Sequence, residues 1–338
     1  MTKPKAAIIG ISEQVLKKEE KSLVSKKCPF GIILFSRNIS SFEQVKKLTS
    51  SLRDAASWDI PIFIDQEGGK VQRLSGSDWL SFPPINIFGK IAKKSLKLAI
   101  EGTYLNHQLI ADDLTALGIN VNCSPCLDIY SKSASEIIGN RSFSDDPNIV
   151  HILGKTACEA MLSRGVIPVI KHLPGHGRAN ADSHKKLPEV KEDLYTLEQS
   201  DFIPFKKLNN NLFGMTAHIL FKSIDPVLPI SISAKALNYI RNNLFFEGIL
   251  LSDDIEMSAL SGALNVRAQN IIKAGYDVVL YCGGNNLKNE KLLDTVPLIN
   301  VNAWQKWLKG SSQVTQFFEP FDRDASRSRL KHLLGNYY

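Results

Sequence analysis

Short apolar runs recur eight times along the chain, and this repetition restricts the fold more than any other feature of the sequence. The runs cover residues 6–11, 30–35, 60–64, 119–122, 166–170, 212–216, 248–251 and 277–281. Residues 166–170 are apolar throughout, which is typical of a parallel strand buried on both faces. We therefore interpret the eight runs as strands.

Amphipathic segments with helical spacing lie between these runs. One of them, residues 42–52, follows the candidate cap Ser41, and another, residues 149–161, is entered through Asp146. Strands that alternate with helices pair in parallel, because each helix returns the chain to the same edge of the sheet. Eight such units in 338 residues fit a closed (β/α)8 barrel better than an open sheet.

The predicted fold class is therefore α/β, as a single-domain (β/α)8 TIM barrel. We assign the catalytic barrel to residues 1–300 and expect residues 301–338 to form a helical surface tail of the same domain. The tail is rich in aromatic residues, including Trp304 and Trp307.

Polar side chains follow most of the predicted strands, at the point where each strand ends. They are Arg37 and Asn38, Asp65 to Glu67, Asn122, Lys171 and His172, His218, Asp253 and Asp254, and Cys282. In TIM barrels the carboxyl ends of the strands form one face, and that face carries the active site. The sequence therefore predicts that these residues meet in one bowl.

The densest group of titratable residues follows the fifth run, on a segment that we expect to be a loop punctuated by glycine and proline. It contains Lys171, His172, His176, Asp182 and His184. Binding and catalytic residues collect on loops that a rigid scaffold holds in place. Three histidines and an aspartate could hold a metal, but their spacing is not that of a helical zinc motif and the Lys171 ammonium would repel a cation. We expect no metal and no organic cofactor.

Bulk composition excludes several classes of protein. The net charge of +7 comes from lysines interleaved with glutamates, as on solvated helix faces, so nucleic acid is not an expected partner. The first apolar run is too short for a signal peptide or a membrane span. The five cysteines are scattered and odd in number, which favours reduced thiols and a cytoplasmic location. Cys123 and Cys126 form a C-x-x-C pair without a second pair, so we interpret them as packed side chains.

Asp253 and Asp254 end the seventh run, and a carboxylate in that position can act as a nucleophile, a base or a ligand. Only one of the two fits a simple role as a helix cap. A carboxylate that faces a proton donor across the bowl suits glycoside hydrolysis, in which one group attacks and another protonates the leaving oxygen.

These residues resemble the β-N-acetylglucosaminidases of glycoside hydrolase family 3, especially the short cytoplasmic type that recycles cell-wall fragments. The resemblance runs from about residue 6 to residue 284 and includes residues 31–38, 64–73, 139–143, 171–177, 182–184 and 252–254. Cys123, Cys126 and Glu256 depart from the usual pattern of the family, but none of them has one of the roles that the resemblance implies.

The resemblance implies that Asp253 is the nucleophile and that His184 is the general acid/base, oriented by Asp182. It also implies a set of residues that hold the N-acetylglucosamine ring, namely Asp65, Arg73, Arg141, Lys171 and His172. A histidine with a free pKa of about 6.5 can exchange protons near neutral pH without deep burial. A neighbouring aspartate would favour its charged form.

The implied activity is that of a retaining exo-β-N-acetylglucosaminidase acting on peptidoglycan fragments, N-acetylglucosaminyl-anhydro-N-acetylmuramic acid with or without its peptide. Such an enzyme would serve cell-wall recycling, and with it cell shape and division. A small amino-sugar or muropeptide is the expected partner, with no membrane partner and a monomeric enzyme. The same residues would also serve a phosphorylase, and a non-catalytic amino-sugar-binding protein is the alternative from another class.

Overall fold

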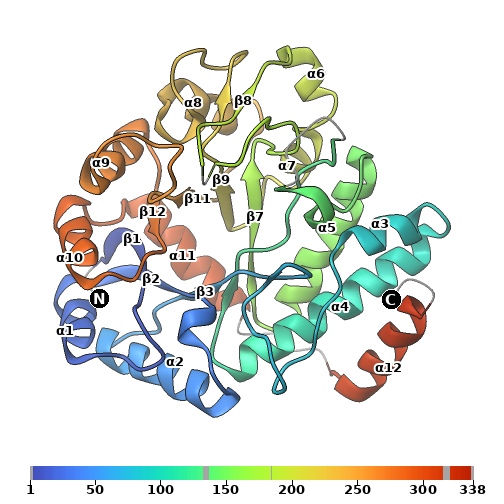
Figure 1. Ribbon diagram of the computed structural model, residues 1–338, viewed down its shortest axis with the longest axis horizontal. Helices are drawn as coiled ribbons and strands as arrows, with labels where there is room; N and C mark the ends of the chain where they lie inside the picture. The colour runs from blue at the N-terminus through green and yellow to red at the C-terminus, as the bar shows by residue number, and fades with distance from the viewer. Residues whose placement is uncertain (1–2, 132–136, 184, 315–319, 336–338) are drawn as a thin grey trace.

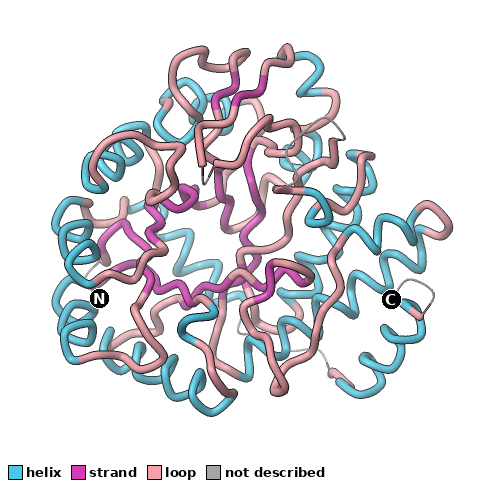
Figure 2. The backbone as a smooth tube through the Cα atoms, viewed as in Figure 1, coloured by secondary structure: helices cyan, strands magenta, loops and turns pink. Residues whose placement is uncertain are grey.

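The computed structural model describes residues 3–131, 137–183, 185–314 and 320–335. Eight parallel strands close into a barrel, and helices surround them (Figures 1 and 2). In order around the barrel the strands are β1 (Lys5–Gly10), β2 (Pro29–Leu34), β3 (Ile62–Ile64), β6 (Val121–Asn122), β7 (Ile167–Leu173), β9 (Phe213–Thr216), β11 (Ile249–Asp254) and β12 (Val278–Tyr281). The predicted single-domain TIM barrel is confirmed.

Every predicted strand overlaps one barrel strand, but two of the strands continue past their predicted carboxyl ends. Strand β7 continues to Leu173 and β11 to Asp254, so Lys171, His172 and Asp253 lie within strands and not on loops. The expectation that Lys171 and His172 lie on a loop is wrong. The backbone of Lys171 still pairs with Met215 of β9, whereas His172 is the extra residue where the register shifts before Leu173. The backbone N–H of His172 donates to the Asp128 side chain.

Twelve α-helices are present among the described residues. Their bounds are α1 (Lys18–Lys27), α2 (Phe42–Ala56), α3 (Asn86–Ala92), α4 (Leu96–Ala116), α5 (Pro147–Leu162), α6 (Leu194–Glu198), α7 (Ile203–Lys207), α8 (Ala234–Asn242), α9 (Leu264–Ala274), α10 (Asn286–Thr295), α11 (Val301–Val314) and α12 (Arg323–Leu334). The side chains of Ser41 and Asp146 cap α2 and α5, since each accepts a hydrogen bond from a backbone N–H of the first turn. Within the described part of the chain, no helix has the length and apolar character needed to cross a membrane.

Two small sheets connect the loops at the carboxyl ends of the strands. Strands β4 (Gln66–Gly68) and β5 (Val71–Gln72) form an antiparallel pair directly after β3. Strands β8 (Glu189–Val190) and β10 (Leu220–Phe221) pair in parallel and join the loops that follow β7 and β9. These pairings hold the loops that surround the mouth of the barrel.

Helix α11 packs against the interior of the barrel at the amino-terminal ends of its strands. Trp304 and Trp307 belong to the same buried cluster as the inward-facing residues of the strands. The ring of Trp307 lies 5.6 Å from that of Phe30 and 5.9 Å from that of Phe213. We expected a helical surface tail from residue 301, but α11 is part of the core, because its aromatic side chains fill one end of the barrel. The division of the chain at residue 300 stays a prediction.

We predict that Trp307→Ala destabilises the protein by about 3–5 kcal/mol, because it leaves a cavity between aromatic rings that cannot all move inward. Trp307 is 3% exposed, whereas its neighbour Leu308 is 47% exposed. Leu308→Ala is therefore the matched control, with an expected change within about 0.5 kcal/mol. Urea unfolding of the two variants checks this, and equal losses would contradict the assignment of α11 to the core.

Candidate active site

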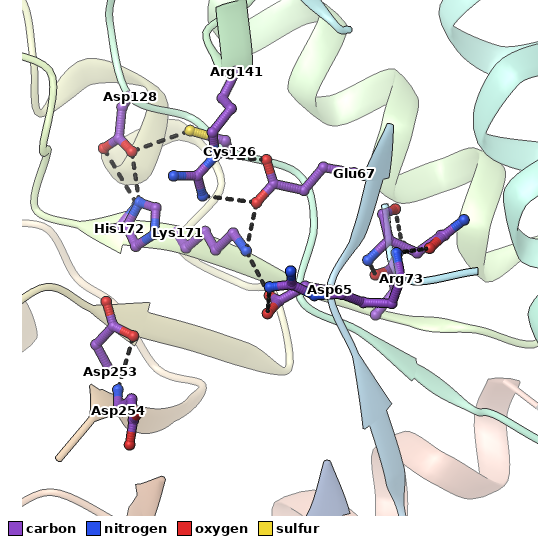
Figure 3. A network of polar contacts seen from close by, with 12 residues as sticks. Asp65, Glu67, Arg73, Cys126, Asp128, Arg141, Lys171, His172, Asp253 and Asp254 are labelled. Carbon is purple, nitrogen blue, oxygen red and sulfur yellow. Dashed lines mark hydrogen bonds and ion pairs between the residues drawn. The ribbon is translucent and has the colours of Figure 1, made fainter. Parts of the chain in front are cut away.

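A cavity of about 180 Å³ opens at the carboxyl ends of the barrel strands. Six of the eight site residues predicted from the sequence line it, namely Asp65, Arg73, Arg141, Lys171, His172 and Asp253. They come from four separate segments of the chain, which are the segment after β3, the loop after β6, the end of β7 and the end of β11, so the barrel brings together residues that are distant in the sequence. Figure 3 shows these six side chains with their polar contacts.

Lys171 is the centre of a buried network of charges. Its ammonium is 2.9 Å from Oδ1 of Asp65 and 2.6 Å from Oε1 of Glu67. Arg73 binds the other oxygen of Asp65 at 3.0 Å. Burial alone would raise the pKa of the Asp65 carboxyl, but Lys171 and Arg73 outweigh it and hold that pKa well below its usual range. Asp65 is therefore an ionised acceptor, placed at the edge of the cavity.

Glu67 is a second carboxylate of this network, although its sequence position predicted it only as a polar residue at a strand end. Its carboxylate accepts hydrogen bonds from Nε and from one terminal nitrogen of Arg141, at 2.9 and 2.7 Å. Burial would raise the pKa of Glu67, but Arg141 and Lys171 lower it from 4.5 to about 2. Glu67 thus fixes two cations that face the cavity. The only sign of this in the sequence is its place at the end of the third run.

Asp128 holds His172 and His176 in place, and its sequence position predicted no such role. Its Oδ2 lies 2.7 Å from Nδ1 of His172, and its Oδ1 accepts the backbone N–H groups of His172 and His176. The Asp128 carboxylate can only accept, so Nδ1 of His172 carries the hydrogen of this bond. The two histidine rings pack edge to face at 5.6 Å. Burial lowers the pKa of His176 from 6.5 to about 4, and the nearby His172 adds to this.

Cys126, Asp128 and His172 place three groups of metal-ligand type within 4.8 Å of one another. The contacts between them are those of hydrogen bonds, since the Cys126 thiol lies 3.1 Å from the same oxygen that His172 contacts. Burial raises the pKa of the Cys126 thiol well above its usual value, so the sulfur keeps its proton. This cluster orients His172, and both cysteines of the C-x-x-C pair are buried and free, as predicted.

Asp253 stands where the pairing of β11 with β12 changes register. Leu251 pairs with Val278 but Asp254 with Leu280, so β11 has one extra residue in this interval. The hydroxyl of Ser252 fills part of the gap by accepting the backbone N–H of Leu280. Bulges of this kind turn a side chain to a new direction and are common beside active sites.

The two adjacent carboxylates point in opposite directions. In Figure 3 the carboxylate of Asp253 is turned toward the side where His172 and Lys171 lie, and that of Asp254 is turned away. The backbone N–H of Asp254 donates to Asp253, whereas the Asp254 carboxylate accepts N–H groups of Glu256 and Cys282. Burial raises the pKa of Asp254 from 3.8 to about 6, and the Asp253 charge adds to this. Asp254 also lines the cavity, but its Oδ1 accepts two backbone N–H groups, so Asp253 is the carboxylate with fewer hydrogen bonds to the protein.

Asp182 and His184 belong to the segment after β7. His184 lies outside the described residues. The carbonyl of Asp182 accepts the backbone N–H groups of Lys185 and Lys186, and Asp182 is not among the residues that line the cavity. Ser183 does line it, and its carbonyl accepts the backbone N–H of Ala259 from the turn that follows Asp253. The segment that carries Asp182 is therefore attached to the turn after β11.

Comparison with known proteins gives consistent matches. Residues 3–303 match the glycosyl hydrolase family 3 N-terminal domain. A β-hexosaminidase of Nitrosomonas eutropha is 32% identical over 84% of this chain and 82% of its own, and one of Alkalilimnicola ehrlichii is 35% identical over 81% and 80%. The crystal structure of NagZ from Neisseria gonorrhoeae in complex with N-trifluoroacetyl-D-glucosamine superposes with a TM-score of 0.87 at 28% identity, covering 98% of both chains.

The charge network predicts how stability depends on pH. The pKa of Glu67 is lower in the folded protein than in the unfolded chain, so its contribution is complete above pH 4.5 and is lost as the pH falls toward 2. Glu67→Gln should lower the free energy of unfolding by about 3–5 kcal/mol at pH 7, because Arg141 and Lys171 stay buried with too little negative charge beside them. Below pH 4.5 the difference from the wild type should shrink.

Urea unfolding of both proteins between pH 7 and pH 3 measures this. Glu13→Gln is the control, since it removes a carboxylate from an exposed pair with Lys17 and should change stability by less than about 1 kcal/mol. A difference between Glu67→Gln and the wild type that stays constant down to pH 3 would contradict the lowered pKa.

Proposed function

The chain belongs to glycoside hydrolase family 3 and is a glycoside hydrolase, and on this premise we propose that it is a retaining exo-β-N-acetylglucosaminidase. The observation that carries the proposal is the arrangement of one cavity. Asp253 is presented to it by a bulge in β11, opposite a network of fixed donors and acceptors. The related β-hexosaminidases and the NagZ complex with an N-acylglucosamine support an amino sugar as the substrate.

The cavity suits one terminal sugar ring. Its volume of about 180 Å³ is smaller than the roughly 300–1,000 Å³ of sites for drug-sized ligands. We assign ring binding to Asp65, Arg73, Arg141, Lys171 and His172. The Asp65 carboxylate can accept hydrogen bonds from two hydroxyl groups, while the cations donate to sugar oxygens. Because their charges are already paired, these groups are held in place before the sugar arrives, which lowers the entropy cost of binding.

In the first step, a carboxylate oxygen of Asp253 bonds to the anomeric carbon of the sugar. The bond from that carbon to the leaving oxygen breaks, and its electron pair stays on the oxygen, which takes a proton from the His184 imidazolium. Asp182 would orient His184 and favour its charged form. The link from Ser183 to Ala259 supports a joint function, since it ties the chain beside His184 to the turn after the nucleophile.

In the second step, water gives a proton to the neutral His184 and bonds to the anomeric carbon. The bond to Asp253 breaks and the carboxylate is restored. Two displacements at the same carbon return its original configuration, which is why the reaction retains stereochemistry. The network around Lys171 takes no covalent part and keeps the ring still through both steps.

The natural substrate in this proposal is a peptidoglycan fragment, N-acetylglucosaminyl-anhydro-N-acetylmuramic acid with or without its peptide, and the reaction takes place in the cytoplasm. Support comes from the resemblance of residues 171–177, 182–184 and 252–254 to the short family members that recycle cell-wall fragments. The small cavity also favours removal of a single terminal residue over cleavage within a chain.

An aryl N-acetylglucosaminide and the matching aryl glucoside, each with and without inorganic phosphate, test the proposal. We expect release of free N-acetylglucosamine from the first substrate and a rate that phosphate does not change. Asp253→Ala should lose several orders of magnitude in rate with either leaving group, since the bond-forming oxygen is gone.

Each other outcome excludes a part of the proposal. Formation of the sugar 1-phosphate would indicate a phosphorylase, and sugar binding without turnover would indicate a binding protein. A preference for the glucoside would contradict the amino-sugar assignment. Activity above about one percent in Asp253→Ala would move the nucleophile elsewhere, with Asp254 as the next residue to test.

His184→Ala separates the acid/base from the nucleophile. A sugar alkoxide must be protonated as it leaves, whereas p-nitrophenolate leaves with little help. The variant should therefore lose far more activity on the disaccharide than on the aryl substrate in the first step. Azide should restore turnover of the aryl substrate, because it attacks the glycosyl-enzyme without a base.

His332→Ala, an exposed position on α12, is the control and should behave like the wild type. Asp182→Ala should show a milder form of the His184→Ala pattern. Equal losses of His184→Ala on both substrates, with no rescue by azide, would assign His184 a structural role.

A further inference from the structure

His218 is a fully buried histidine near the active site with no role in the steps above. It is the polar residue that follows β9, and both it and Ser231 are 0% exposed. Its Nδ1 lies 2.8 Å from the hydroxyl of Ser231, and its Nε2 lies 3.0 Å from the backbone carbonyl of Asp254. The ring therefore bridges two elements, the 3₁₀ turn η3 (Ile230–Ile232) and the end of β11.

The partners of the ring determine where its proton lies. A carbonyl oxygen can only accept, so Nε2 must carry the hydrogen that is donated to Asp254. In the neutral ring Nδ1 is then an acceptor, and the Ser231 hydroxyl donates to it. The hydrogen bonds thus run in one direction, from Ser231 through His218 to Asp254.

Asp254, whose carbonyl His218 contacts, also forms a hydrogen bond with the side chain of Asp253. The backbone N–H of Asp254 donates to Oδ1 of Asp253 at 2.8 Å. On its other side, the Asp254 carboxylate accepts the N–H of Cys282 at the end of β12, and Ile255 donates its N–H to Leu280. Asp254 is therefore held by β12 on one side and by His218 on the other. The carbonyl and the N–H of Asp254 lie in successive peptide planes joined at its Cα, so anchoring the carbonyl limits the rotation that would turn the N–H away from Asp253.

The turn that carries Ser231 is itself anchored. The hydroxyl of Tyr276 donates to the carbonyl of Ile230 at 3.1 Å, and the N–H of Ile230 donates to Ile219 at 2.8 Å. Tyr276 is buried beside the first residues of β12. The turn thus holds Ser231 in place, so its hydroxyl has a defined position relative to the ring of His218.

We propose that Ser231 and His218 are positioning residues for the nucleophile, because they hold the Asp254 backbone that orients the Asp253 carboxylate. The inference rests on the proposed function, in which Asp253 attacks the anomeric carbon. A bulge frees Asp253 from the regular ladder, so something other than the ladder must fix its direction. Displacement of a reacting group by about 1 Å can cost on the order of 100-fold in rate.

Two substitutions at His218 separate its two contacts. In His218→Gln the side-chain amide can place an N–H near the position of Nε2, whereas in His218→Asn the shorter amide reaches only the position of Nδ1. If the contact with Asp254 is the important one, His218→Gln should keep most of the kcat on an aryl N-acetylglucosaminide. His218→Asn should lose about 10- to 100-fold in kcat. The affinity for free N-acetylglucosamine should change less than twofold in both, since the ring is held by other residues.

Ser231→Ala tests the hydrogen bond between Ser231 and Nδ1 of His218 by removing only a hydroxyl group. Ser233→Ala is its matched control. Ser233 is also 0% exposed and lies two residues along the chain, but its hydroxyl bonds Asp225 and caps α8. Both variants should lose thermal stability, and only Ser231→Ala should lose kcat. Nitrogen-15 NMR of the His218 ring provides a readout apart from activity. The wild type should show the neutral form protonated on Nε2, and Ser231→Ala should change the Nδ1 signal.

Several results would overturn the proposal. Equal kcat values in His218→Gln and His218→Asn would show that the bond to Asp254 does not matter. Losses of kcat that follow thermal stability in all four variants, Ser233→Ala included, would show a merely structural role. A ring protonated on Nδ1 would contradict the direction of the hydrogen bonds. An inactive wild type would instead contradict the proposed function, a result distinct from an active wild type whose His218 variants are unaffected.

Discussion

The buried ammonium of Lys171 is the interaction on which the active site depends. An unpaired charge at 2% exposure would be unstable, so Lys171 requires the two carboxylates that contact it. Those carboxylates, Asp65 and Glu67, follow β3, whereas Lys171 lies on β7. Through Glu67 the same network fixes Arg141, which belongs to the loop after β6. The ion pairs of this network thus hold three segments of the barrel in a fixed relative position.

The two sides of the cavity are organised differently, as their functions require. On the binding side every charged group has partners within the protein, so little rearrangement is needed when a sugar binds. On the other side, the hydrogen bond described for the Asp253 carboxylate comes from one backbone N–H. A nucleophile must keep an electron pair available, so a carboxylate saturated with donors, as Asp128 is, would attack poorly. The adjacent Asp254 accepts the structural hydrogen bonds that Asp253 does not.

The barrel was predictable because each of its strands is a continuous apolar run, a pattern that depends on neighbouring residues alone. The ends of β7 and β11 were not, since both strands continue past their apolar runs, each with a register shift near its end, at His172 and near Asp253. Trp304 and Trp307 were misplaced for a related reason. Nothing local distinguishes an aromatic residue on a surface helix from one that enters a barrel.

The site residues carried by the family resemblance do converge on one cavity, apart from Asp182 and from His184, which lies outside the described residues. Glu67 was predicted only as a polar strand end and no role was predicted for Asp128, because the partners that give these carboxylates their function come from distant segments. Closure of the barrel also depends on a distant segment, and this matters while the chain is being synthesised. Strand β1 pairs with both β2 and β12, so one edge of the first strand stays unpaired until residue 281 has left the ribosome, on the order of tens of seconds later. Throughout that interval the nascent chain exposes an apolar strand edge, the kind of surface that chaperones protect.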